Sequence, residues 1–140
     1  MKRRVAAVLL GSALFALALA PAAQGKKYNT SIFANSSGGT TSTSVYGSLT
    51  SPFDNCKKRR VVTVAYTSTS GQAVTATDKT DLTGGFRVPS DPINPVPLPP
   101  AGGPITVKVK KKRVKPFKED GEAVKNICKA KSVTATPLAF

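Results

Sequence analysis

The stretch Thr80-Asp81-Leu82-Thr83-Gly84-Gly85-Phe86 has the composition of a tight turn that leads into a β-strand. The Asp81 carboxylate can accept hydrogen bonds from backbone amides two residues further along the chain. Gly84 or Gly85 can adopt the positive φ that residues with a β-carbon resist. We therefore expect a structural turn built by Asp81, Gly84 and Gly85, with Phe86 buried in the core of a β-sheet protein.

Segments with the pattern of β-strands lie on both sides of this turn. The strongest runs from Arg60 to Tyr66, because its residues are mostly β-branched or aromatic. Residues 45–49 and 105–110 alternate apolar and polar side chains, which is typical of strands with one buried face. A weak strand at the edge of a sheet is expected at residues 73–77, and the last strand is expected at residues 127–133. In the last of these, Cys128 and Ala130 are expected to point inward.

Two segments are expected to lack regular structure. Residues 89–104 are rich in proline, which excludes a regular hydrogen-bonded ladder and predicts a semi-rigid loop. The charged residues 119–122 are expected to form a loop before the last strand.

About six or seven short strands without a convincing helix favour an all-β fold, and we expect a β-sandwich. We expect this domain at residues 44–136. Residues 23–43 are dominated by Ser, Thr, Asn and Gly, which bury too little apolar surface to offset chain entropy, so a flexible leader is predicted there. Asn29 and Asn35 lie in N-glycosylation patterns, and whether they are modified depends on the host.

Residues 1–22 have the parts of a secretory signal peptide. Lys2, Arg3 and Arg4 precede a short apolar run, which is followed by small residues, and we place cleavage after Ala22, within residues 20–25. A retained membrane anchor is the alternative, but about 16 apolar and small residues fall short of the roughly 20 that span a bilayer. The sequence therefore predicts a secreted, extracellular protein without stable membrane insertion after cleavage.

The two cysteines, Cys56 and Cys128, are expected to form one disulfide, because an extracellular location lets such a bond persist. Closing this loop would stabilise the fold by roughly 4 kcal/mol on the loop-entropy estimate. A metal site or a reactive thiol is the alternative, but the chain has no histidine and no further cysteine. We predict a structural disulfide, no metal ion and no cofactor.

Four segments resemble the transthyretin-like, or carboxypeptidase regulatory-like, family of β-sandwich modules. Residues 80–86 match the T-D-x-x-G-x-F turn of that family in every defined position. Residues 45–49 resemble its first-strand V-x-G-x-V pattern, and residues 60–64 resemble its second strand. Residues 103–109 resemble its G-x-Y-x-V-x-V strand, with Ile105 in place of the aromatic residue. The resemblance implies a Greek-key, Ig-like or transthyretin-like β-sandwich of seven strands without catalytic residues. Modules of this kind serve other proteins as a spacer or a binding unit.

The formal net charge of the chain is +14, and the loss of Lys2, Arg3 and Arg4 with the signal peptide leaves +11. Such an excess favours anionic surfaces. For an exported protein these are acidic polysaccharide, cell-wall polymer or lipid headgroups rather than nucleic acid. The cations form one cluster at residues 57–60 and a denser one made of Lys108, Lys110, Lys111, Lys112, Arg113 and Lys115.

The denser cluster is the candidate binding site. In an extended strand Lys108, Lys110 and Lys112 would project from one face at about 7 Å spacing, which suits a polymer with repeated anionic groups. The alternative is that these lysines keep an edge strand soluble and block edge-to-edge pairing. Phe117 is the only aromatic ring nearby, which argues against base stacking, and the chain has no Trp to stack on sugars.

No catalytic residue is predicted. Ser-His-Asp and Cys-His catalysis need histidine, and no motif selects a Ser–Lys pair. Calcium could be imagined at Asp78, Asp81 and Asp91, but turn formation explains the first two without an ion. The sequence therefore favours a secreted, non-enzymatic structural or adhesive module, with an extracellular binder of anionic polymers or membrane surfaces as the alternative. The oligomeric state stays open.

Overall fold

The computed structural model describes residues 25–90, 96–119 and 122–138. The predicted signal peptide at residues 1–22 lies outside the described residues. The described chain is all-β apart from one 3-10 turn, η1 (Asp54–Cys56), which confirms the predicted all-β class. In the same ranges no helix has the length and apolar character needed to cross a bilayer.

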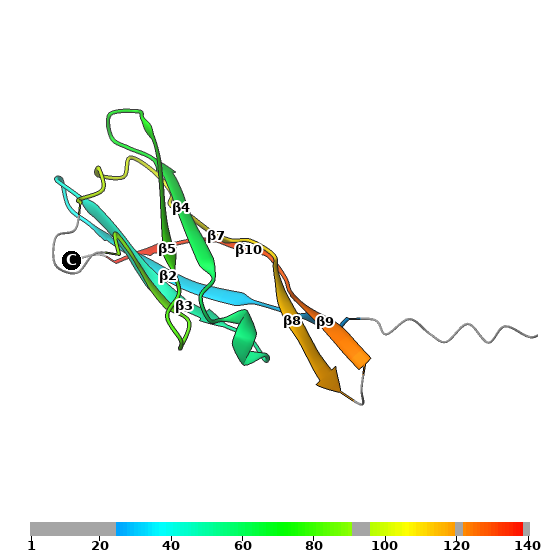
Figure 1. Cartoon of the computed structure of the whole chain (residues 1–140). Helices are drawn as coiled ribbons and strands as arrows, with labels where there is room; N and C mark the ends of the chain where they lie inside the picture. The colour runs from blue at the N-terminus through cyan, green and yellow to red at the C-terminus, as the bar shows by residue number, and fades with distance from the viewer. Residues whose placement is uncertain (1–24, 91–95, 120–121, 139–140) are drawn as a thin grey trace, which may run out of the picture.

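Two four-stranded sheets face each other, and a small third sheet extends from one end of this sandwich (Figure 1). The strand orders are β11-β2-β3-β6, β10-β7-β4-β5 and, in the third sheet, β1-β9-β8. The described residues thus contain eleven strand segments, more than predicted, because several are short or belong to the third sheet. The strands are β1 (Lys27–Tyr28), β2 (Ser31–Gly38), β3 (Thr43–Thr50), β4 (Val61–Thr67), β5 (Ala73–Lys79), β6 (Gly85–Val88), β7 (Thr106–Val109), β8 (Lys112–Glu119), β9 (Glu122–Cys128), β10 (Lys131–Thr134) and β11 (Thr136–Pro137).

The core lies between the two larger sheets. Val62, Val64 and Tyr66 of β4 are buried there, as the alternation in residues 60–66 predicts. They meet inward side chains of β3, β6 and β7, which include Val45, Leu49, Phe86, Val88, Val107 and Val109. The predicted weak edge strand is also confirmed, since β5 pairs only with β4 in its sheet.

The prediction of a flexible leader at residues 23–43 is wrong, because β2 occupies its second half. β2 pairs with β3 along its whole length, from Ser31 opposite Thr50 to Gly38 opposite Thr43. Its inward positions are Ile32, Ala34 and Ser36, of which the last two are buried. The small side chains of Ala34 and Ser36 are enough to fill the core at these positions, because the facing sheet contributes the larger side chains of Val and Tyr residues. The folded domain therefore begins before residue 44.

The chain between β7 and β10 also differs from expectation. β8 and β9 pair with each other and are followed by β10, where a single strand was expected. Glu119 and Glu122 of the expected charged loop lie in β8 and β9, and residues 120–121 lie outside the described residues. The chain leaves the third sheet after Cys128 and joins β7 at Lys131, so the expected strand at 127–133 is interrupted. Ala130 lies in this interruption and is exposed rather than inward.

The turn at residues 80–86 has the expected construction. The Asp81 Oδ1 atom accepts hydrogen bonds from the N–H groups of Thr83 (2.7 Å) and Gly85 (2.9 Å) and from the Thr83 hydroxyl. These contacts, the Thr83 hydroxyl first, hold the pKa of the Asp81 carboxyl below its ordinary value. Gly84 is the residue with positive φ, at 98°, and a β-carbon there would lie 2.5 Å from the Leu49 carbonyl oxygen.

The described part of the proline-rich segment closes the opposite end of the sandwich. The Tyr66 hydroxyl donates to the Pro99 carbonyl (2.6 Å), and burial raises the pKa of this phenol. The Thr43 N–H donates to the Leu98 carbonyl (3.0 Å). As predicted, the segment forms no regular ladder, but these bonds fix it against both sheets.

Candidate functional site

Arg60, the one buried cation among the residues whose burial is described, ties the sandwich to the third sheet. Its side chain is 2% exposed, and its guanidinium donates to the carbonyls of Cys56 (2.7 Å), Lys110 and Lys129 (3.2 Å) and to the Thr30 hydroxyl (3.3 Å). Burial lowers its pKa. These acceptors lie in η1, after β7, after β9 and before β2, so one side chain holds four chain segments. All are neutral oxygens, which leaves the positive charge of Arg60 uncompensated by these contacts.

The disulfide lies at the same junction and confirms the predicted pairing. Cys56 in η1 is bonded to Cys128 at the end of β9, with a Cα–Cα distance of 5.3 Å, and both residues are fully buried. The bond links the connection between β3 and β4 to the third sheet.

Lys112 brings the two basic clusters together. At the start of β8 its ammonium group donates to the Lys58 carbonyl (2.9 Å) and lies 3.5 Å from the Asn55 carbonyl. Burial, followed by the charges of Arg60 and Arg59, lowers the pKa of Lys112. Residues 57–59 and 110–113, far apart in the sequence, therefore form one surface.

The predicted stripe of Lys108, Lys110 and Lys112 along one strand is wrong. Lys108 is exposed on the outer face of β7, between Thr63 and Ser132 on the neighbouring strands. β7 ends at Val109, and the chain enters the third sheet at Lys112, whose side chain turns toward η1 instead. β7 is also an interior strand, paired with β4 and β10, so its one lysine, Lys108, does not protect a sheet edge.

We call the surface formed by Lys57, Lys58, Arg59, Lys110, Lys111, Lys112 and Arg113 the basic end. Arg59, Lys110, Lys111 and Arg113 are exposed there. Asp54 pairs with Lys57 (2.8 Å) and Lys58 (3.5 Å), and its pKa is lowered by these contacts, that with Lys57 first. The backbone of Lys115 lies in β8, and its side chain is outside the described part.

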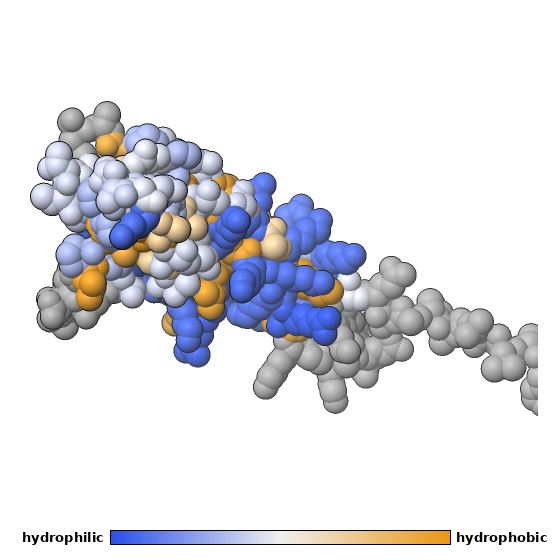
Figure 2. Space-filling view, turned by 90° about the horizontal axis from the view of Figure 1, so that it is seen from above, coloured by the Kyte–Doolittle hydropathy of each residue, from blue (hydrophilic) through white to orange (hydrophobic). Residues whose placement is uncertain are grey.

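A hollow of about 370 Å³ opens on the basic end between η1, the turn at Leu82 and the start of β8. Leu82 and Val114 contribute apolar surface, and the cationic lining comes from Lys58, Arg59, Lys112 and Arg113. Figure 2 shows the most hydrophilic residues gathered on this side of the molecule, with paler residues over the opposite end.

Arg59 has an unusual backbone for its residue type, with a φ of 50°. A left-handed conformation costs a residue with a β-carbon roughly 1–2 kcal/mol. The conformation is held by the Arg59 N–H, which donates to the Thr80 carbonyl (3.1 Å). Nothing in the sequence around Arg59 indicates this conformation.

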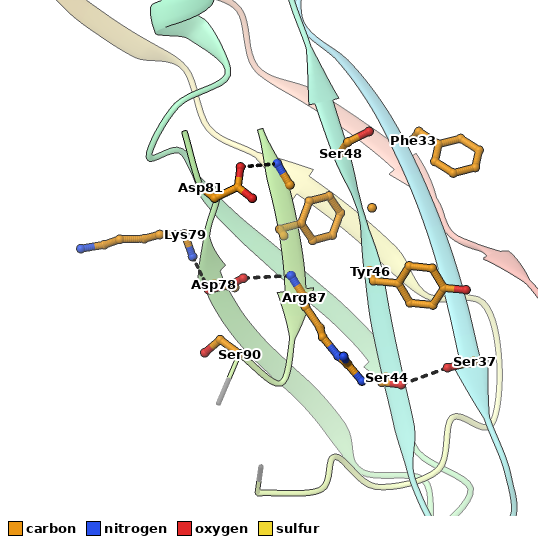
Figure 3. A pocket seen from close by; sticks show the side chains of 13 residues that line it. Phe33, Ser37, Ser44, Tyr46, Ser48, Asp78, Lys79, Asp81, Arg87 and Ser90 are labelled. Carbon is orange, nitrogen blue, oxygen red and sulfur yellow. Dashed lines mark hydrogen bonds between the residues drawn. The ribbon is translucent and has the colours of Figure 1, made fainter. Parts of the chain in front are cut away.

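A second, larger hollow of about 850 Å³ lies on the outer face of β2, β3 and β6 (Figure 3). Phe33 and Tyr46 stand over β2 and β3, and Arg87 extends from β6 toward Ser44. Ser48 and Gly85 are opposite each other in register. Because both residues are small, the surface at this point is recessed below the larger side chains around it. Sequence reasoning missed this site, because Phe33 falls in the segment predicted to be flexible.

The described residues contain no group of three or more His, Cys, Asp or Glu side chains that could hold a metal ion. Comparison of the chain with protein-family models, with curated proteins and with solved structures finds no match.

Proposed function

We propose that the protein is an exported, non-enzymatic β-sandwich module that adheres to anionic polymers through its basic end. The observation that carries this proposal is the 2.9 Å contact between Lys112 and the Lys58 carbonyl, which joins two basic clusters into one surface. Exposed charges separated by more than about 8 Å are largely screened at physiological ionic strength, so a compact cluster retains a polymer better than a dispersed one.

Arg59 supplies independent support. A glycine would relieve the unfavourable backbone conformation at this position, yet the residue is an exposed arginine beside the cationic hollow. Unfavourable conformations that persist in native proteins cluster at functional sites. We infer that the Arg59 side chain contributes more to binding than to stability.

Export is supported by the signal-peptide pattern of residues 1–22 and by the disulfide, which persists in oxidising compartments. The polymer partners that fit are an acidic polysaccharide or an anionic cell-wall polymer. The resemblance of residues 80–86 to transthyretin-like modules supports a binding or spacer role rather than catalysis, as does the lack of histidine in the chain.

The test is salt-gradient elution of Arg59→Gly and Arg59→Lys from immobilised heparin and from immobilised polygalacturonate. We expect Arg59→Gly to elute at lower salt than the parent while its melting temperature is equal or higher. Arg59→Lys keeps the charge and should elute close to the parent, without the gain in stability. Elution of Arg59→Gly at the parental salt concentration would contradict a role for this residue in binding. If neither column retained the parent protein, the proposed adhesion would be wrong and a purely structural role would remain.

A further inference from the structure

We propose that the hollow on the outer face of β2, β3 and β6 is a second binding site, which takes an acidic sugar such as a uronic acid unit of a polysaccharide. It lies on a different surface from the basic end, and its argument does not depend on that site. Its volume of about 850 Å³ falls in the range of about 300–1,000 Å³ that ligand pockets occupy.

Two aromatic residues, Phe33 and Tyr46, stand on this face, and Tyr46 is partly exposed. Phe33 is 63% exposed, although it lies in the middle of a paired strand. Phe33 is opposite Ser48, and Tyr46 lies two residues before Ser48 on β3, so the two rings are diagonal neighbours. Diagonal positions are about 7–8 Å apart and within reach of one ligand. An aromatic face has negative charge density that attracts the C–H groups of a pyranose ring.

Arg87 supplies one cation on this face. It is directly opposite Tyr46 in register, and its backbone N–H donates to Asp78 Oδ2 (3.0 Å). Among the described residues no carboxylate pairs with its guanidinium, which extends over β3 toward Ser44 (Figure 3). A guanidinium binds a carboxylate through two parallel hydrogen bonds, so a sugar carboxylate suits this group.

The two acidic side chains beside the hollow are already engaged. Asp78 Oδ1 accepts from the Lys79 N–H (2.6 Å), and Asp81 accepts from the turn. Their negative charge opposes binding of a highly charged sulfated or phosphorylated group next to Arg87. The hydroxyls of Ser37, Ser44 and Ser48, with Ser37 and Ser44 3.0 Å apart, offer donors and acceptors to sugar hydroxyls. One carboxylate on a hydroxyl-rich ring therefore fits this face best.

The experiment is calorimetric titration of the protein with trigalacturonate at about physiological ionic strength, where long-range attraction is screened. The variants are Arg87→Gln and Phe33→Thr, the latter keeping a β-branched residue in the strand. Lys79→Gln is the matched control, because Lys79 lines the same hollow but its side chain points away from it (Figure 3). We expect Arg87→Gln to weaken binding by about tenfold or more, the effect of one lost charge-assisted interaction. Phe33→Thr should also weaken it, and Lys79→Gln should have no effect.

Three outcomes would overturn the proposal. The first is equal weakening by Arg87→Gln and Lys79→Gln, which would indicate general electrostatic attraction. The second is equal affinity for trigalacturonate and its methyl ester, which would remove the carboxylate from recognition. The third is loss of binding when Arg59, Lys111 and Arg113 are replaced by Gln but not when Arg87 is replaced, which would assign the sugar to the basic end and leave the proposed function intact.

Discussion

Asp81 determines the shape of a turn through three hydrogen bonds to one carboxylate oxygen. This could be predicted from the sequence, because an aspartate followed by two glycines has few other conformations that use its side chain. Arg60 could not be predicted in the same way. In the sequence it is one of four consecutive cations, and only the assembled junction shows that it is buried while Arg59 beside it is exposed. Local composition does not encode which cation a distant strand will cover.

The first prediction at this scale concerns the pH dependence of stability. The pKa of Asp81 is lower in the folded protein than the ordinary value of 3.8, so the folded state favours the carboxylate. Its contribution to stability is therefore present above that value and is lost as the pH falls through and below it. Asp81→Asn should be less stable than the parent near pH 6, and the difference should shrink toward pH 2, as followed by melting temperature. A difference in melting temperature between parent and variant that stays constant from pH 6 to pH 2 would contradict the lowered pKa of Asp81.

The strands that could be predicted are those whose inward residues are large. β3, β4 and β7 alternate Val, Leu or Tyr with polar residues, and each has its apolar face in the core. β2 was missed because two of its three inward residues, Ala34 and Ser36, are small, and its largest apolar side chain, Phe33, points to solvent. The paired strands β8 and β9 were missed because they are rich in Lys and Glu, so no apolar alternation distinguishes them from a loop.

The disulfide is the element-scale link between the third sheet and the sandwich, and its removal should be costly. Cys56→Ser combined with Cys128→Ser should lower the free energy of unfolding by roughly 2–5 kcal/mol, because the reduced chain gains conformational freedom when unfolded. Urea unfolding followed by circular dichroism measures this loss. An unchanged midpoint in the double variant would show that Arg60 and the strand pairings hold the junction without the bond.

At the scale of the whole molecule, charge is separated along the strands. The turns at residues 39–42 and 68–72 and the segment 98–104 hold no charged residue and lie together at one end of the sandwich. The basic end lies at the other, beside the third sheet. The sequence showed two clusters and a total charge, but not that they converge, because convergence depends on β7 leading into β8 next to η1. A molecule of this kind is expected to approach a polyanion in one orientation.

The central claim is that the position of the cations, and not the total charge, produces adhesion. A relocated variant tests it most directly. Arg59, Lys111 and Arg113 are replaced by Gln, and the exposed residues Thr41, Thr69 and Gln72 of the neutral end are replaced by Lys, so that the net charge is unchanged. The measurement is the salt concentration at which parent and variant elute from immobilised polygalacturonate. We predict that the relocated variant elutes at clearly lower salt with an unchanged circular dichroism spectrum, whereas elution at the parental concentration would contradict binding through the basic end.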